Sequence, residues 1–99
     1  MEILTEKRLE TRLKREAERL NGMYLKFTPQ GTNGMPDRLI LFPVNLLYFT
    51  EIKAPGKKLR PLQVKRKQQL EKLGFKVFVI DSFKAIEDFI QEVKNEIQT

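Results

Sequence analysis

The sequence contains no cysteine and no histidine among its 99 residues. These two absences exclude the usual structural zinc sites, thiol catalysis, Ser-His-Asp triads and acid–base catalysis by imidazole. Any chemistry that the chain performs must therefore use carboxylates, lysines or a metal ion bound through oxygen atoms.

Long hydrophobic runs are also missing, because the uninterrupted apolar stretches are only a few residues long. No segment is long enough to span a membrane, and no basic segment leads into a hydrophobic one with a small-residue cleavage site. We therefore expect no membrane association and an intracellular location. The compactness of the chain would suit a phage or mobile-element protein in the cytoplasm of a bacterium or a phage-infected cell.

The composition is that of an ordinary globular protein, with 40% apolar and 32% charged residues. A chain of this length fits one compact domain, so we expect residues 1–99 to form a single unit. Nineteen lysines and arginines against thirteen acidic residues give a formal charge of +6. Such an excess attracts polyanions; taken alone it favours nucleic acid or an anionic membrane surface and does not choose between them.

Hydrophobic periodicity and turn residues predict seven elements. Helices are expected at residues 5–20, 61–73 and from about 82 onward, and strands at residues 23–28, 37–42, 46–53 and 75–80. The order α-β-β-β-α-β-α predicts an α/β fold with a mixed central sheet flanked by helices. In the last helix, we expect buried side chains at Phe83, Ile86, Ile90, Val93 and Ile97.

The strand predicted at residues 46–53 carries the most informative pattern. Apolar residues lie on both of its faces, so the strand is expected to be central and covered by helices on each side. Glu51 and Lys53 are two residues apart and therefore project to the same side. A hairpin with the preceding strand would bring Asp37 next to them. An acid–base pair with a second carboxylate nearby can hold a hard divalent cation and act on phosphate.

A third carboxylate is expected from the first helix. On a helical wheel, Glu6 falls near the middle of the apolar stripe and Glu10 toward its edge, which predicts an inward-pointing acid. Each acid has a simpler explanation: Glu6 alone would more often be solvated, and Asp37 after a proline could merely shape a loop. Glu51 and Lys53 could form a salt bridge at a strand end.

Three motifs in order strengthen the catalytic interpretation. They are Gly-Met-Pro-Asp-Arg at residues 34–38, Glu-Ile-Lys-Ala-Pro-Gly-Lys at residues 51–57 and Pro-Leu-Gln at residues 61–63. Together they resemble the virus-type replication-repair nuclease (VRR-NUC) branch of the PD-(D/E)xK nuclease superfamily, over nearly the whole chain from residue 6 to residue 82. The resemblance implies a restriction-endonuclease-like αβββαβ core, followed here by a C-terminal helix.

The resemblance also implies roles for the site residues. Asp37 and Glu51 would bind Mg²⁺ or Mn²⁺, helped by the backbone carbonyl of Ile52. Lys53 would orient the attacking water or stabilise charge on the phosphate.

Two further residues are matched from the flanking helices. Glu6 matches the first-helix acid of the family, although Glu10 lies one turn away and could serve instead. Gln63 matches the polar residue that reaches the site from the second helix.

The basic residues divide into two groups. Those next to the proposed site are expected to bind phosphate: Lys57, Lys58, Arg60, Lys65, Arg66 and Lys67. A second group lies on the first helix, where a solvated face is slightly favoured over DNA contact: Lys7, Arg8, Arg12, Lys14, Arg15 and Arg19. No base-reading set is evident, so recognition of DNA shape is expected.

The leading hypothesis is a metal-dependent, structure-selective DNA endonuclease. Small members of the family that resemble this chain act as symmetric dimers on branched DNA, which implies a homodimer that cuts four-way (Holliday) junctions. The alternatives are a flap or nicking nuclease, a non-catalytic nucleic-acid-binding module, and a subunit that needs a partner before it can cut.

Overall fold

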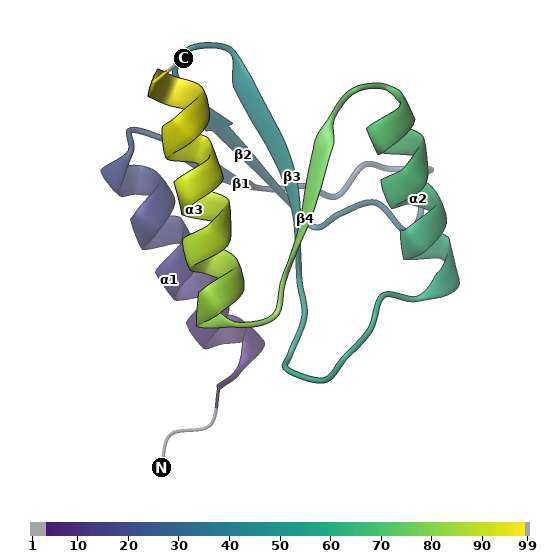
Figure 1. Cartoon of the computed structure of the whole chain (residues 1–99). Helices are drawn as coiled ribbons and strands as arrows, with labels where there is room; N and C mark the ends of the chain where they lie inside the picture. The colour runs from purple at the N-terminus through teal and green to yellow at the C-terminus, as the bar shows by residue number, and fades with distance from the viewer. Residues whose placement is uncertain (1–3, 99) are drawn as a thin grey trace.

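The computed structural model describes residues 4–98, and its seven elements follow the predicted order (Figure 1). In chain order they are α1 (Glu6–Arg19), β1 (Met23–Lys26), β2 (Arg38–Phe42), β3 (Leu46–Ile52), α2 (Pro61–Lys72), β4 (Lys76–Ile80) and α3 (Phe83–Gln98). The predicted α/β class, the αβββαβ core and the C-terminal helix are confirmed. Boundaries differ from the predicted ones by at most two residues.

Local chemistry explains where α1 begins and ends. The hydroxyl of Thr5 accepts a hydrogen bond from the Arg8 N–H at 3.2 Å and so caps the first turn. At the other end, Asn21 has a φ of 63°, a conformation that asparagine tolerates better than most residues. The predicted helix at residues 5–20 therefore includes the N-cap residue Thr5 and the C-cap residue Leu20.

The four strands form one mixed sheet in the order β1-β2-β3-β4. β1 pairs antiparallel with β2, β2 pairs antiparallel with β3, and β3 pairs parallel with β4. The predicted hairpin between the second and third strands is therefore present. β3 is interior, as its two apolar faces predicted.

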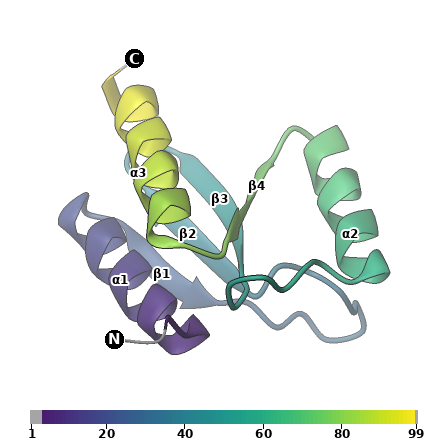
Figure 2. The same cartoon turned by 60° about the horizontal axis from the view of Figure 1, so that its bottom comes forward.

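Helices cover the two faces of the sheet unequally (Figure 2). α1 and α3 share one face with the larger core cluster, to which the sheet contributes Ile40, Phe42, Tyr48, Ile52 and Ile80. Within α3, Phe89 is fully buried and was not among the expected core residues. Ile97 is 44% exposed, so the expectation that it is buried was wrong. It lies in the last turn of α3, beyond the last buried residue of the helix, Val93.

α2 covers the other face over a smaller cluster built on Phe49, Leu70 and Val77. Its contacts with the sheet are mainly to β4. The loop before β2 also supports it, because the Arg66 side chain donates a hydrogen bond to the carbonyl of Asn33 at 2.8 Å. No helix within residues 4–98 is long and apolar enough to cross a membrane.

Candidate active site

The sheet register sets Asp37 opposite Glu51. Arg38 pairs with Thr50 in the antiparallel β2–β3 ladder, so one step further along the ladder brings Asp37 and Glu51 face to face. Side chains directly opposite each other in an antiparallel pair lie on the same side of the sheet, about 5 Å apart at Cβ. Tyr48 and Ile52 face the α1–α3 layer, so Glu51 points to the opposite side, toward α2.

The two carboxylates differ in their exposure to water, because the Asp37 side chain is 36% exposed whereas Glu51 is largely buried. Glu51 is only 5% exposed, and burial followed by the negative charge of Asp37 raises its pKa to about 7. Burial also raises the pKa of Asp37, while the neighbouring Arg38 guanidinium lowers it. Two close acids with raised pKa values resist full ionisation unless positive charge is supplied.

The backbone of Ile52 supplies a further oxygen atom next to the two carboxylates. The Ile52 N–H donates a long hydrogen bond of 3.4 Å to Oδ1 of Asp37. The N–H and C=O of one strand residue point to the same side of the strand, so the Ile52 carbonyl is directed toward Asp37 as well. Two carboxylates and a carbonyl are hard oxygen donors of the kind that Mg²⁺ and Mn²⁺ accept.

Positive charge is close to the carboxylate pair. Lys53 follows Glu51 by two residues on the same face, and both Lys53 and Arg60 lower the pKa of Glu51. The Lys53 N–H donates to the carbonyl of Ile80 at 3.0 Å, which holds its backbone at the end of β3. The acid–base pair predicted from the sequence is therefore on one side of the strand.

Gln63 lies on the sheet-facing side of α2 and is 7% exposed. Its side-chain oxygen accepts a hydrogen bond from the Arg60 N–H at 2.8 Å and so caps the helix. The sequence predicted only a site role for this residue. With its oxygen engaged at the cap, Gln63 has its amide N–H groups left for donating a hydrogen bond to water or phosphate.

Glu6 does not join the carboxylate pair. Within residues 4–98, no three carboxylates lie close enough to hold a metal ion together. Glu6 is exposed, so the expectation that it points inward was wrong. It begins α1, one turn before the first buried residue, Leu9, and α1 packs on the face of the sheet opposite to that of Glu51.

Glu10, the alternative acid, reaches the site indirectly through Arg38. The Arg38 guanidinium binds Glu10 at 2.8 Å, lies 3.6 Å from Oδ2 of Asp37 and also donates to the hydroxyl of Tyr24 at 3.0 Å. Sequence reasoning missed Tyr24 and assigned Arg38 no role. The signal was available, because a residue next to Asp37 on a strand must face the α1 layer.

The basic residues predicted to bind phosphate divide in the structure. Lys57, Lys58, Arg60 and Lys65 are exposed. Arg66 is instead engaged with the Asn33 carbonyl at 2.8 Å and with Gln69 at 3.0 Å. These bonds give Arg66 a structural explanation as a link between α2 and the loop before β2.

Comparisons with known proteins show similarity to a phage protein and to a solved structure. The chain is 38% identical over 82 residues to a protein called "Putative nuclease p44" from Acyrthosiphon pisum secondary endosymbiont phage 1; the match covers 83% of this chain and 88% of that protein. A solved structure described as a VRR_NUC domain has a TM-score of 0.82 and 32% identity, over 87% of this chain and 94% of that one. No family model matches.

Proposed function

Because the chain belongs to the VRR-NUC family of nucleases, we propose that it is a divalent-metal-dependent endonuclease that hydrolyses phosphodiester bonds in branched DNA. The observation that carries the proposal is the closeness of Asp37 to Glu51, just beyond the Arg38–Thr50 pair of the β2–β3 ladder, where the charge of Asp37 raises the pKa of Glu51. Their mutual repulsion and burial make this pair costly as two free anions. A site that binds a cation gives the arrangement a physical reason.

The metal-binding residues in this proposal are Asp37, Glu51 and the carbonyl of Ile52. A bound Mg²⁺ or Mn²⁺ would lower the pKa of a nearby water and offset negative charge on the phosphate. The oxygen donors on the chain meet this requirement, because Mg²⁺ is often held by only one or two carboxylates.

The other side chains have distinct tasks in hydrolysis. A water oxygen loses a proton and forms a bond to phosphorus, while the bond to the leaving oxygen breaks and that oxygen takes up a proton. Lys53 places a fixed positive charge beside the carboxylates, where it stabilises the negative charge that develops on the phosphate. Gln63 donates its amide N–H to water or phosphate. Lys57, Lys58, Arg60 and Lys65 bind the flanking phosphates.

The test is cleavage of labelled duplex, flap, splayed and four-way DNA with Mg²⁺, Mn²⁺ or EDTA. We expect cleavage only with the metal and preferentially on branched substrates. Asp37→Asn and Glu51→Gln should each reduce the cleavage rate by at least about 1,000-fold, since each removes a metal ligand. Exposed Glu18 lies elsewhere, so Glu18→Gln is the matched control and should cleave normally.

The results of this assay also separate the alternatives. Near-normal cleavage by either site variant would refute the assigned site. Binding without any metal-dependent cleavage would indicate a non-catalytic module. Preferential cutting of flaps or single strands would replace junction resolution with flap processing or nicking.

The proposal includes a homodimer and a bacterial setting. Two sites related by a two-fold axis suit the paired cuts that resolve a four-way junction. The phage relative supports a location in the cytoplasm of a bacterium or a phage-infected cell. Size-exclusion chromatography with light scattering should give about twice the 11.7 kDa chain mass.

A further inference from the structure

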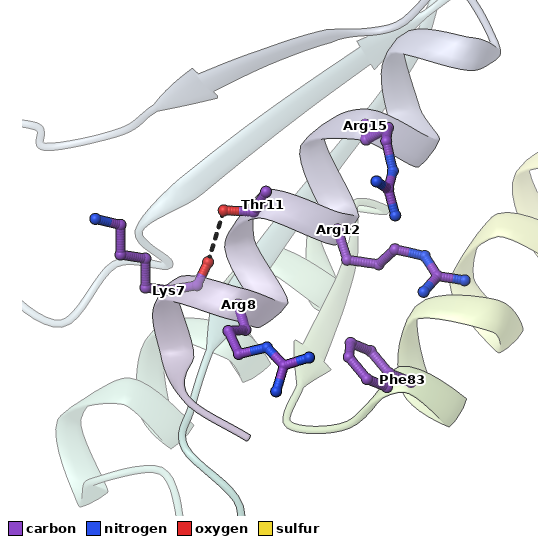
Figure 3. Close-up of a pocket in the computed structure, with 6 residues that line it drawn as sticks. All are labelled: Lys7, Arg8, Thr11, Arg12, Arg15 and Phe83. Atoms are coloured by element: carbon purple, nitrogen blue, oxygen red, sulfur yellow. Dashed lines mark hydrogen bonds between the residues drawn. The ribbon is translucent and has the colours of Figure 1, made fainter. Parts of the chain in front are cut away.

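A basic groove lies between α1 and the start of α3, away from the residues assigned to the candidate site (Figure 3). It encloses about 340 Å³ and is lined by Lys7, Arg8, Thr11, Arg12, Arg15 and Phe83. In Figure 3 the guanidinium groups of Arg8, Arg12 and Arg15 gather on the side of α1 that faces Phe83. We call this feature the arginine groove.

The arginine groove has no carboxylate in its lining. The acids of α1 point elsewhere: Glu10 binds Arg38, and Glu16 lies beside the groove, where it bridges Arg12 and Arg19. Arg15 makes no ion pair with any residue among 4–98. Like charges on one helix face repel each other and lower its stability slightly. Positive charge therefore accumulates on the side of α1 that lines the groove.

Phe83 gives the groove a fixed geometry. The carbon of the Arg12 guanidinium lies 5.4 Å from the centre of the Phe83 ring, a cation–π distance. This contact orients Arg12 and occupies the ring face, so a nucleic-acid base is not expected to stack there. The planar guanidinium groups suit bidentate hydrogen bonds to phosphate oxygens.

The arginine groove and the candidate site flank the same end of the sheet. Phe83 follows the last residue of β4, Ile80, by three positions, and Ile80 pairs with Ile52 in β3. In Figures 1 and 2 the start of α1 and the loop after β3 lie at this same end, in different layers. DNA that reaches this end can therefore contact both.

We propose that the arginine groove binds the sugar-phosphate backbone of the DNA whose bond is cut at the α2 side of the sheet. This inference rests on the proposed function, because it assigns a second contact for the same substrate. Arg8 and Arg15 are seven residues apart, or about 10 Å along the helix axis. That length corresponds to about three base steps of duplex DNA.

The test is DNA binding by full-length protein in EDTA, measured by fluorescence anisotropy at several salt concentrations. The variant Arg8→Gln/Arg12→Gln/Arg15→Gln removes three charges from the groove while keeping good helix formers. Its matched control, Arg19→Gln/Lys72→Gln/Lys76→Gln, removes three exposed charges at the last residues of α1 and α2 and the first of β4. Both variants have the same net charge.

We expect the groove variant to bind four-way DNA at least tenfold more weakly than the control at 0.15 M salt. The slope of log affinity against log salt should fall by about 2 to 3, as expected for the loss of three phosphate contacts. Equal losses in the two variants would overturn the proposal, because only net charge would then matter. Thermal unfolding should show that both variants are folded.

Cleavage distinguishes this proposal from the proposed nuclease activity. A groove variant that binds weakly while wild-type protein cleaves supports both. If wild-type protein shows no metal-dependent cleavage but the two variants still differ in binding, the proposed nuclease activity is refuted. The proposal that the groove binds DNA is then still supported. If wild-type protein cleaves and the two variants bind DNA equally, only the proposal that the groove binds DNA is refuted.

Discussion

Glu51 makes the stability of the metal-free protein depend on pH. Folding raises its pKa from 4.5 to about 7 by burial and by the charge of Asp37, against the opposing effects of Lys53 and Arg60. The folded state therefore holds a proton that the unfolded state releases between these values. The stabilisation that this bound proton gives to the folded state is fully present below pH 4.5 and is lost as the pH rises through 7.

We accordingly predict that Glu51→Gln stabilises the metal-free protein at pH 8, by up to about 3 kcal/mol. The uncharged amide avoids the cost of an ionised buried carboxylate, and this advantage should disappear near pH 4.5. Urea unfolding in EDTA at the two pH values measures the effect. An equal difference at both pH values would show that Glu51 does not titrate in this range. Exposed Glu18→Gln is the control.

Arg38 acts as a positioning residue for Asp37 because its guanidinium joins three elements. It binds Glu10 of α1, the hydroxyl of Tyr24 of β1 and the backbone carbonyl of Asp37 at 2.9 Å. Lysine keeps the charge but lacks this fork of donors. If position rather than charge matters, Arg38→Lys should behave more like Arg38→Gln than like wild type.

We expect both Arg38 variants to cleave DNA at least tenfold more slowly at low metal concentration. They should also need more Mg²⁺ for half-maximal activity, since Asp37 is less well held. Titration of activity against Mg²⁺ measures this shift, and Glu10→Gln should shift it in the same direction but less. Full activity of Arg38→Lys at unchanged Mg²⁺ demand would assign Arg38 an electrostatic role only.

At the scale of elements, the docking of α2 depends on Gly34. Its φ is +81°, and an added Cβ would lie 2.6 Å from Cγ of Leu62 in α2. Gly31 in the same loop has a similar φ of +79° but open space around its Cα. The two glycines therefore share the backbone penalty of an alanine substitution and differ only in the clash.

Gly34→Ala should destabilise the protein more than Gly31→Ala does. The shared strain is about 1 kcal/mol, and the clash with Leu62 adds about 1 to 3 kcal/mol at Gly34. Because α2 carries Gln63, we also expect a lower cleavage rate from Gly34→Ala at temperatures where it is folded. Chemical denaturation measures the first effect. Equal destabilisation by the two variants would mean that α2 moves away without cost.

The strands of the candidate site could be predicted from the sequence more completely than the helices around it. Strand alternation and the hairpin were enough to predict that Asp37 and Glu51 share a face, because both depend on local periodicity and pairing. The capping role of Gln63 is a local contact with Arg60, three residues earlier, which the sequence analysis did not consider. The exposure of Glu6 and the Glu10–Arg38 contact depend instead on how α1 rotates against the sheet. That packing is set by contacts between distant segments, which no local pattern encodes.

At the scale of the whole molecule, the face of the sheet around β1 is open. β1 is an edge strand, and its side chains Met23 and Leu25 are 57% and 37% exposed on the face that α2 only partly covers. An exposed apolar edge strand is a site where another chain can pair. This edge is therefore where we expect the second copy of the proposed dimer to bind.

Met23→Lys/Leu25→Lys should convert the dimer to a monomer in light scattering, because the charges would be buried without partners. Val44→Lys is the matched control, since Val44 is 81% exposed at the β2–β3 turn and should leave the dimer intact. The monomeric variant should still nick one strand of branched DNA but lose paired cuts in four-way junctions. If the wild-type protein is monomeric and still makes paired cuts, the proposed dimer is wrong. Each resolved junction would then require two separate binding events by single protein molecules.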